Sequence, residues 1–252
     1  MSANKIKKPP DYSSYAKKYA ESRPGYPEEL FKYLASLVKE HNLVWDCATG
    51  NGQAALSLTE YFKKVIATDI SSEQIKNATL HDRIEYKVCK ADESGLENNS
   101  VDLVTVASAI HWFDLDKFYK EVKRVVKPGG VIAAWSYHVG YVNPPFDKLF
   151  KRFFLDVISP YFGTGAWLVD EQYSTINLPG SEIDSANFSV EVKWNLYKLL
   201  NFIESWSAAQ EYKKEKGQNP VDLIIKELKQ LWGEAEKINI LRWPLYLKIS
   251  RL

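Results

Sequence analysis

The residues best placed to do chemistry lie in one short stretch, which runs from Asp46 to Gly52 and reads DCATGNG. An apolar run, Leu43 to Trp45, precedes it and predicts a buried strand, and a helical pattern begins at Gln53. A strand, a glycine turn and a helix in this order are typical of the start of a nucleotide-binding crossover, because glycine lets a ligand approach the backbone closely. The stretch therefore predicts a ligand-binding turn.

Two kinds of ligand use such a turn, and Asp46 distinguishes them. Gly50-x-Gly52-x-x-Ala55 fits the dinucleotide fingerprint, and Asp69 follows at about the expected interval of 20 residues. A carboxylate ahead of the glycines, however, repels a pyrophosphate and suits a positively charged group such as an ammonium. A tight turn that binds no ligand is the structural alternative.

The motif Asp46-x-Ala48-x-Gly50-x-Gly52 resembles the first motif of the class I S-adenosylmethionine (AdoMet)-dependent methyltransferases, acidic-x-Gly-x-Gly-x-Gly. It departs from the family pattern at Ala48, where glycine is more frequent. We expect alanine to be accommodated there by a turn that stays at negative φ.

Two further strings resemble one group within this family, the type-11 enzymes similar to trans-aconitate methyltransferase. These are AIHWFD at Ala109–Asp114 and Tyr-x-x-x-Arg-Pro-x-Tyr-Pro at Tyr19–Pro27. The resemblance implies AdoMet as the cofactor and methyl transfer to a small molecule, with O-methylation of a carboxylic acid as the first expectation.

The resemblance also implies which residues hold the cofactor. Asp69 would accept hydrogen bonds from the ribose hydroxyls, Asp92 from the adenine amine, and Arg23 would face the methionine carboxylate. The full set of expected cofactor residues is Tyr19, Arg23, Asp46, Ala48, Gly50, Gly52, Gln53, Asp69, Ile70, Ala91, Asp92, Ala107, Ser108 and His111. The alternatives are that Asp69 caps a helix and that Asp92 is a simple turn residue.

His111 is the candidate catalytic residue, with Trp112, Tyr137 and Tyr141 as candidate substrate contacts. A hydroxyl acceptor would need a general base, and His111 is the nearest candidate, whereas a carboxylate acceptor would need none at neutral pH. The alternative for His111 is a structural histidine bonded to a loop carbonyl.

The elements that must position these residues alternate between strand and helix patterns, which predicts an α/β fold. Strands are expected at 43–45, 65–70, 84–90, 101–107, 131–138, 188–196 and 240–249. The resemblance implies a Rossmann-like, mostly parallel sheet of seven strands with an antiparallel last strand, helices on both faces and a helical, aromatic cap.

The chain, 1–252, is expected to form one class I methyltransferase domain. Within it we expect a flexible tail at 1–11, lid helices at 12–40 and an inserted cap at 138–185, which is rich in aromatic residues. The string Asn143-Pro144-Pro145-Phe146 matches a signature of amino-methyltransferases but follows the fifth strand instead of the fourth. Proline in the first turn of a helix explains it without chemistry.

The overall composition limits the partners. A net charge of +1 argues against nucleic acid, and no apolar run approaches the roughly 20 residues of a membrane span. Cys47 and Cys89 are expected to be reduced thiols of a cytoplasmic protein, no metal-ligand cluster is expected, and the protein would be a monomer or homodimer. The alternative functions are an NAD(P)-dependent oxidoreductase, a nucleic-acid methyltransferase and a non-catalytic AdoMet-binding protein.

Overall fold

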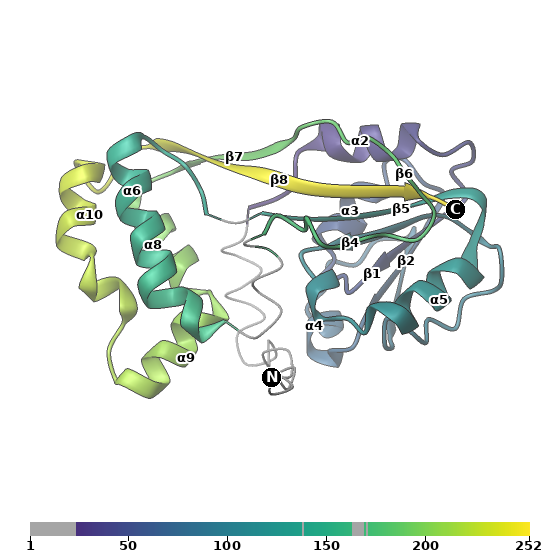
Figure 1. Ribbon diagram of the computed structural model, residues 1–252, viewed down its shortest axis with the longest axis horizontal. Helices are drawn as coiled ribbons and strands as arrows, with labels where there is room; N and C mark the ends of the chain where they lie inside the picture. The colour runs from purple at the N-terminus through teal and green to yellow at the C-terminus, as the bar shows by residue number, and fades with distance from the viewer. Residues whose placement is uncertain (1–23, 138, 163–168, 170) are drawn as a thin grey trace. The chain divides into compact units, whose positions relative to one another are not determined.

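The computed structural model describes residues 24–137, 139–162, 169 and 171–252, which form two compact units (Figure 1). The sheet unit contains 25–137, the described part of 168–188, and 245–252. The helical unit contains Pro24, the described part of 138–167, and 189–244. The predicted tail at 1–11 and the first part of the predicted lid, 12–23, lie outside the described residues.

Seven strands make the central sheet, in the order β3-β2-β1-β4-β5-β8-β6. They are β1 Leu43–Cys47, β2 Lys64–Asp69, β3 Ile84–Val88, β4 Val101–Ala107, β5 Val126–Tyr137, β6 Ser181–Glu182 and β8 Asn239–Arg251. Strands β1 to β5 are parallel, and β8, drawn in yellow, is antiparallel to β5. The predicted fold class is confirmed.

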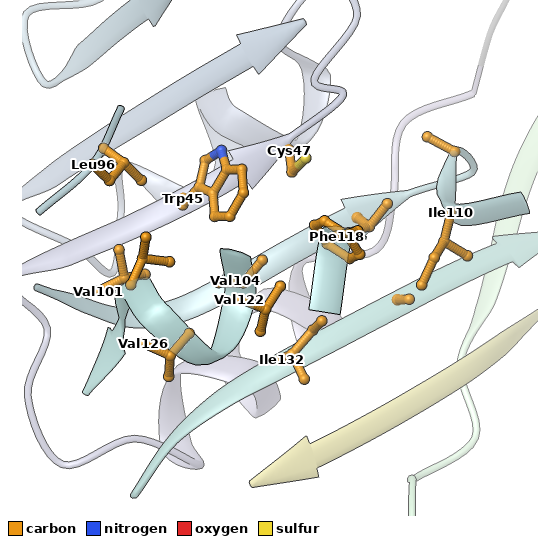
Figure 2. Close-up of a cluster of buried hydrophobic side chains, with 14 of the residues drawn as sticks. Trp45, Cys47, Leu96, Val101, Val104, Ile110, Phe118, Val122, Val126 and Ile132 are labelled. Atoms are coloured by element: carbon orange, nitrogen blue, oxygen red, sulfur yellow. The ribbon is translucent and has the colours of Figure 1, made fainter. Parts of the chain in front are cut away.

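The helices of the sheet unit are α2 Glu28–Ser36, α3 Gln53–Leu58, α4 Ser72–Lys76, the 3₁₀ turn η2 Ile110–Trp112 and α5 Leu115–Val125. Helix α5 places Phe118, Val122 and Val125 against the buried side chains of β1, β4 and β5, as Figure 2 shows for most of this cluster. Trp45 and Phe118 meet edge to face there, with their ring centroids 6.1 Å apart. This apolar face fixes the parallel strands, whose carboxyl ends carry the predicted site.

The sixth sheet strand is not the one that the sequence predicts. The segment predicted at 188–196 does form a strand, β7 Ser189–Trp194, but it pairs with the first half of β8 as an antiparallel ribbon and belongs to the helical unit. Strand β8 has 13 residues, so one half completes the sheet while the other half pairs with β7. The place predicted for 188–196 in the sheet is taken by β6, which pairs with β8 at the edge. Its two residues are too few to show a periodic pattern in the sequence.

The helical unit is built from α6 Pro144–Phe153, the π-helical turn η3 Phe154–Ile158, the 3₁₀ turn η4 Ser159–Tyr161, α8 Leu196–Glu204, α9 Ser207–Lys216, the 3₁₀ turn η5 Pro220–Leu223 and α10 Ile225–Trp232. Aromatic residues form its core: Phe146 stacks on Phe150 at 5.2 Å and meets Trp232 at 5.9 Å. Many of the aromatic residues in the predicted cap thus serve packing. In the part of the chain that is described, no helix is long and apolar enough to cross a membrane.

Asn143 caps α6, since its side-chain oxygen accepts a hydrogen bond from the N–H of Phe146 at 3.1 Å. Pro144 and Pro145 occupy the first turn, where the missing N–H groups cost nothing. The structural explanation of this Asn-Pro-Pro-Phe string is confirmed.

Candidate active site

The predicted site residues of the sheet unit gather at one edge, where β1 to β4 end. Strand β1 lies between β2 and β4, so the chain crosses from one side of β1 to the other and leaves a topological switch point there. In open α/β sheets, ligands bind outside the carboxyl ends of the strands at such a point. The topology therefore brings together the segments at 46–53, 69–70, 91–92 and 107–112.

Every second residue of the turn after β1 has left-handed backbone, with φ of 55° at Ala48, 58° at Gly50 and 87° at Gly52. The expectation of negative φ at Ala48 is wrong, because the turn has the glycine conformation of the family pattern although this residue carries a Cβ. Two features favour glycine at position 52. Its φ is positive, and a Cβ there would overlap the hydroxyl of Tyr86.

Replacing Ala48 with glycine is expected to stabilise the fold by up to about 1 kcal/mol. Left-handed backbone costs alanine about 1–2 kcal/mol, which exceeds the roughly 0.5–1 kcal/mol of extra chain entropy that glycine loses on folding. Urea unfolding of Ala48→Gly measures the difference. Asn99→Gly is the control, because Asn99 has a similar φ of 50° but asparagine tolerates it. A loss of stability in Ala48→Gly would contradict the strain.

Three backbone N–H groups of this turn already have acceptors within the protein. Thr49 donates to the Thr68 carbonyl at 2.9 Å, and Gly52 donates to the Thr49 carbonyl at 3.0 Å. Gly50 donates to Oδ2 of Asp69 at 2.9 Å. A pyrophosphate needs such N–H groups as its own ligands. The turn is therefore suited to a ligand without phosphates.

Asp46 is fully buried beneath the turn. Its two carboxylate oxygens accept hydrogen bonds from the hydroxyls of Thr49 and Thr105, the second at 2.7 Å. Burial raises the pKa of Asp46 to about 6, although both hydroxyls act to lower it. At neutral pH Asp46 is mostly ionised, so it places a negative charge beneath the turn without being exposed itself.

Each carboxylate oxygen of Asp69 accepts one backbone hydrogen bond: Oδ2 from the N–H of Gly50 at 2.9 Å and Oδ1 from the N–H of Ser71 at 2.8 Å. Burial raises the pKa of Asp69, opposed by these two N–H groups. The helix α4 is capped by Ser71, whose hydroxyl accepts from Gln74, so Asp69 is not the cap. Each oxygen of Asp69 keeps lone pairs for a ligand, and the adjacent Ile70 side chain is 66% exposed.

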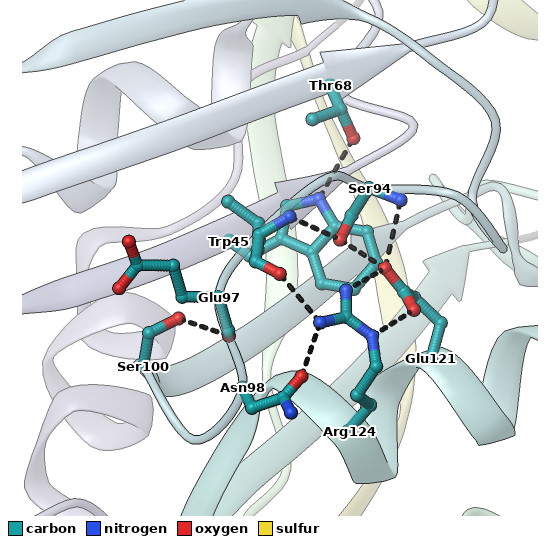
Figure 3. A network of polar contacts seen from close by, with 9 residues as sticks. Trp45, Thr68, Ser94, Glu97, Asn98, Ser100, Glu121 and Arg124 are labelled. Carbon is teal, nitrogen blue, oxygen red and sulfur yellow. Dashed lines mark hydrogen bonds and ion pairs between the residues drawn. The ribbon is translucent and has the colours of Figure 1, made fainter.

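Ala91 and Asp92 lie in the turn after β3, and α5 holds the loop that follows them (Figure 3). Ser94 donates through its N–H and its hydroxyl to the buried Glu121 carboxylate, and Arg124 binds both oxygens of Glu121. Arg124 also donates to the Leu96 carbonyl at 2.7 Å. Burial would raise the pKa of Glu121, but Arg124 and Ser94 hold it below its usual value. This network fixes the loop beyond Asp92.

The end of β4 carries a second polar group of residues. Ala107 ends the strand, and Ser108, at a φ of 54°, accepts a hydrogen bond from the Ser136 hydroxyl at 3.3 Å. His111 lies in η2, with its ring centroid 4.7 Å from that of Trp112. Tyr137 ends β5, and its ring lies 6.2 Å from that of Tyr26.

Two residues of this region were missed at the level of sequence. The hydroxyl of Tyr26 lies 3.3 Å from Oγ of Ser108, and the hydroxyl of Tyr173 lies 2.9 Å from Nδ1 of His111. Tyr26 is the last tyrosine of the Tyr19–Pro27 string and could have been found from it. Tyr173 lies in an irregular segment, 62 residues from His111, and no local pattern marks it.

The remaining predicted residues are distributed differently. Gln53 is the first residue of α3, next to the turn. Tyr19 and Arg23 lie outside the described residues. Tyr141 belongs to the helical unit, where its backbone pairs with Arg242 and its side chain is 49% exposed, and its role as a substrate contact stays a prediction.

A sheet of this strand order, with an acidic residue and a glycine turn at its switch point, defines the class I AdoMet-dependent methyltransferases. The family described as "Methyltransferase domain" matches residues 45–134. A solved structure named as a type II methyltransferase, from Anaeromyxobacter dehalogenans, is 33% identical with a TM-score of 0.85, and the match covers 91% of this chain and 97% of the other.

Two relatives agree with this assignment. A Dictyostelium discoideum protein named as a methyltransferase is 29% identical, over 95% of this chain and 94% of its own length. A Saccharomyces cerevisiae protein named as an S-adenosylmethionine-dependent methyltransferase is 25% identical, over 92% of this chain and 94% of its own. The chain belongs to the type-11 family of AdoMet-dependent methyltransferases.

The residues present fit AdoMet as the cofactor of this enzyme. AdoMet has no phosphate, which agrees with a turn whose N–H groups of Thr49, Gly50 and Gly52 are already bonded. The carboxylate of Asp69 can accept further hydrogen bonds, and the exposed Ile70 offers apolar surface beside it.

Proposed function

We propose that this enzyme methylates a small molecule and that the acceptor atom is a carboxylate oxygen. The observation that carries the proposal is the setting of His111: its Nδ1 lies 2.9 Å from the hydroxyl of Tyr173, and burial lowers the pKa of the imidazole to about 4. A histidine with so low a pKa is a poor general base for a hydroxyl, whereas a carboxylate is already ionised and needs no base. His111 and Trp112 would then contact the acceptor as neutral groups.

The residues of the switch point would hold the cofactor. Asp69 would bind the ribose hydroxyls, Ile70 would cover the adenine, and Asp92 would accept from its amine. The bound AdoMet supplies a methyl group already activated by its sulfonium. The protein then has to hold the acceptor in line with that methyl and exclude water, which requires few catalytic side chains.

Two further observations support a small acceptor over nucleic acid. The net charge of +1 offers no general attraction for phosphates, and Asn143, the residue that resembles a base-binding asparagine, uses its side-chain oxygen to cap α6.

Turnover of AdoMet labelled in its methyl group tests the acceptor class. The protein is incubated with a panel of small carboxylic acids and, as matched controls, the corresponding alcohols, phenols and amines. Carboxylate methylation produces methyl esters, which release labelled methanol on mild alkaline treatment, whereas ethers and methylamines keep the label. Label recovered only in alkali-stable products would refute the proposed acceptor.

The electrostatic role of Asp46 predicts how AdoMet affinity depends on pH. Between pH 7 and pH 5 Asp46 gains a proton, and if only the ionised form binds well, the affinity falls about tenfold. The ammonium of the methionine moiety stays protonated over this range. Calorimetric titration at several pH values measures the effect, and Asp46→Asn is expected to bind weakly at pH 7 and to lose most of this dependence. An equal pH dependence in Asp46→Asn would remove Asp46 as the cause.

Folding stability is expected to change in the opposite direction. Because the folded pKa of Asp46 lies above the unfolded value, its contribution to stability is fully present below about pH 4 and is lost as the pH rises through 6. The free energy of unfolding should therefore fall by up to about 3 kcal/mol over this window, and Asp46→Asn should lack this part of the change. Denaturant unfolding at pH 4.5 and 7 compares the two proteins.

A further inference from the structure

Tyr173 is held in an unusual conformation beside the predicted catalytic histidine. It is fully buried, and both Tyr173 and its neighbour Gln172 have left-handed backbone, with φ of 56° and 57°. Two consecutive non-glycine residues in this region are strained and persist only where the surrounding structure imposes them. The turn is closed by hydrogen bonds from Gln172 to Val169 at 2.9 Å and from Ile176 to Tyr173 at 3.0 Å. The strained turn directs the Tyr173 ring into the sheet unit, toward η2.

The hydroxyl of Tyr173 meets Nδ1 of His111 at 2.9 Å, and the two ring centroids are 6.0 Å apart. Burial raises the pKa of Tyr173, so its hydroxyl stays protonated and neutral. Because His111 is also neutral at neutral pH, one of its ring nitrogens carries a proton and the other does not. A phenol hydroxyl can donate to Nδ1 or accept from an Nδ1–H; as the more acidic O–H it donates to the unprotonated Nδ1, which leaves the histidine proton on Nε2 and fixes how the ring is turned.

We propose that Tyr173 is a positioning residue that fixes the tautomer and orientation of His111, and so determines what Nε2 offers to the methyl acceptor. The last part rests on the proposed function, since it takes His111 to contact the acceptor. The left-handed backbone at 172–173 agrees with this role, since it is the conformation in which the phenol lies 2.9 Å from Nδ1 of His111. Tyr173 acts through His111 and is not itself a catalytic residue.

The tautomer of His111 can be read directly by two-bond proton–nitrogen NMR spectra of the full chain labelled with nitrogen-15 histidine. The chain has four histidines, and the His111 signals are assigned by their loss in His111→Gln. The test variant is Tyr173→Phe, which removes only the hydroxyl. The matched control is Tyr119→Phe, because the Tyr119 hydroxyl on α5 is buried but has no hydrogen-bond partner among the described residues.

The wild type and Tyr119→Phe are expected to show one tautomer of His111 at neutral pH, and Tyr173→Phe a mixture of two. The dissociation constant for AdoMet should stay within about twofold, and kcat for a methylated acceptor should fall about tenfold or more in Tyr173→Phe, because a turned His111 ring no longer holds the acceptor in line with the methyl group. A mixed tautomer in the wild type, or wild-type His111 signals in Tyr173→Phe, would overturn the proposal.

The spectra require no acceptor, so they separate this proposal from the proposed function. If the His111 tautomer changes in Tyr173→Phe while no carboxylic acid is methylated by any variant, the positioning role stands and the acceptor class is wrong. If acids are methylated equally well by the wild type and Tyr173→Phe, the positioning role is refuted and the acceptor class stands.

Discussion

Replacing Asp69 with alanine is expected to weaken AdoMet binding by at least about a hundredfold. A carboxylate that accepts two hydrogen bonds from ribose contributes about 1.5–3 kcal/mol for each charged bond, so their loss exceeds the 2.7 kcal/mol that corresponds to a hundredfold change. The same change removes the acceptor of the Gly50 N–H, which holds the turn after β1. Calorimetric titration with AdoMet measures the affinity.

The control for this variant is Ser71→Ala, two residues away. It removes the hydroxyl that caps α4 but leaves the Asp69 carboxylate and the Ser71 N–H in place. Loss of such a cap is expected to lower stability by about 1 kcal/mol, with AdoMet affinity unchanged. Unchanged affinity in a folded Asp69→Ala protein would exclude Asp69 from the cofactor site.

Much of the site could be predicted from the sequence because its residues end consecutive strands. Asp46 and Asp69 each end an apolar run, Asp92 follows the alternating pattern of β3, and parallel pairing then brings the three segments to one edge of the sheet. The glycines of the turn carry a local signal of their own, since positive φ favours them. Order along the chain and residue type were sufficient to predict that these segments meet at one edge of the sheet.

The rest of the site depends on contacts that have no local signal. The left-handed backbone at Ala48 is imposed by the turn and cannot be read from an alanine. Tyr173 meets His111 from a segment with neither helical nor strand periodicity. The charge of Asp46 was predictable, but its complete burial and its hydrogen bond from Thr105 were not, because Thr105 comes from strand β4, 59 residues further along the chain.

The same limit applies to the strand at 188–196. Its pattern predicts a strand correctly but does not predict the partner of that strand. The partner is the first half of β8, which continues beyond the part of β8 that pairs with β5. Periodicity reports which side of a strand is buried and does not report which sheet the strand joins.

Asp102→Ala is expected to lower the free energy of unfolding by about 2–4 kcal/mol, the largest loss among these variants, because it leaves two backbone N–H groups without their buried acceptor. Oδ2 of Asp102 accepts from the N–H groups of Asn42 and Leu43, both at 2.8 Å, and Oδ1 lies 2.6 Å from Nζ of Lys127. The carboxylate thereby ties together the starts of β1, β4 and β5. Urea unfolding measures the loss.

Glu40→Ala is the matched control, since Glu40 binds the same lysine at 2.8 Å but is exposed. Its ion pair is screened by water, so its removal should change the free energy of unfolding little. The two carboxylates that bind Lys127 differ in burial: the side chain of Asp102 is 3% exposed and that of Glu40 is 60% exposed. An equal loss in the two variants would show that the backbone hydrogen bonds and burial of Asp102 contribute nothing beyond the surface charge. Because Asp102 lies at the start of β4 and the site at its end, the folded variant should bind AdoMet as the wild type does, in contrast to Asp69→Ala.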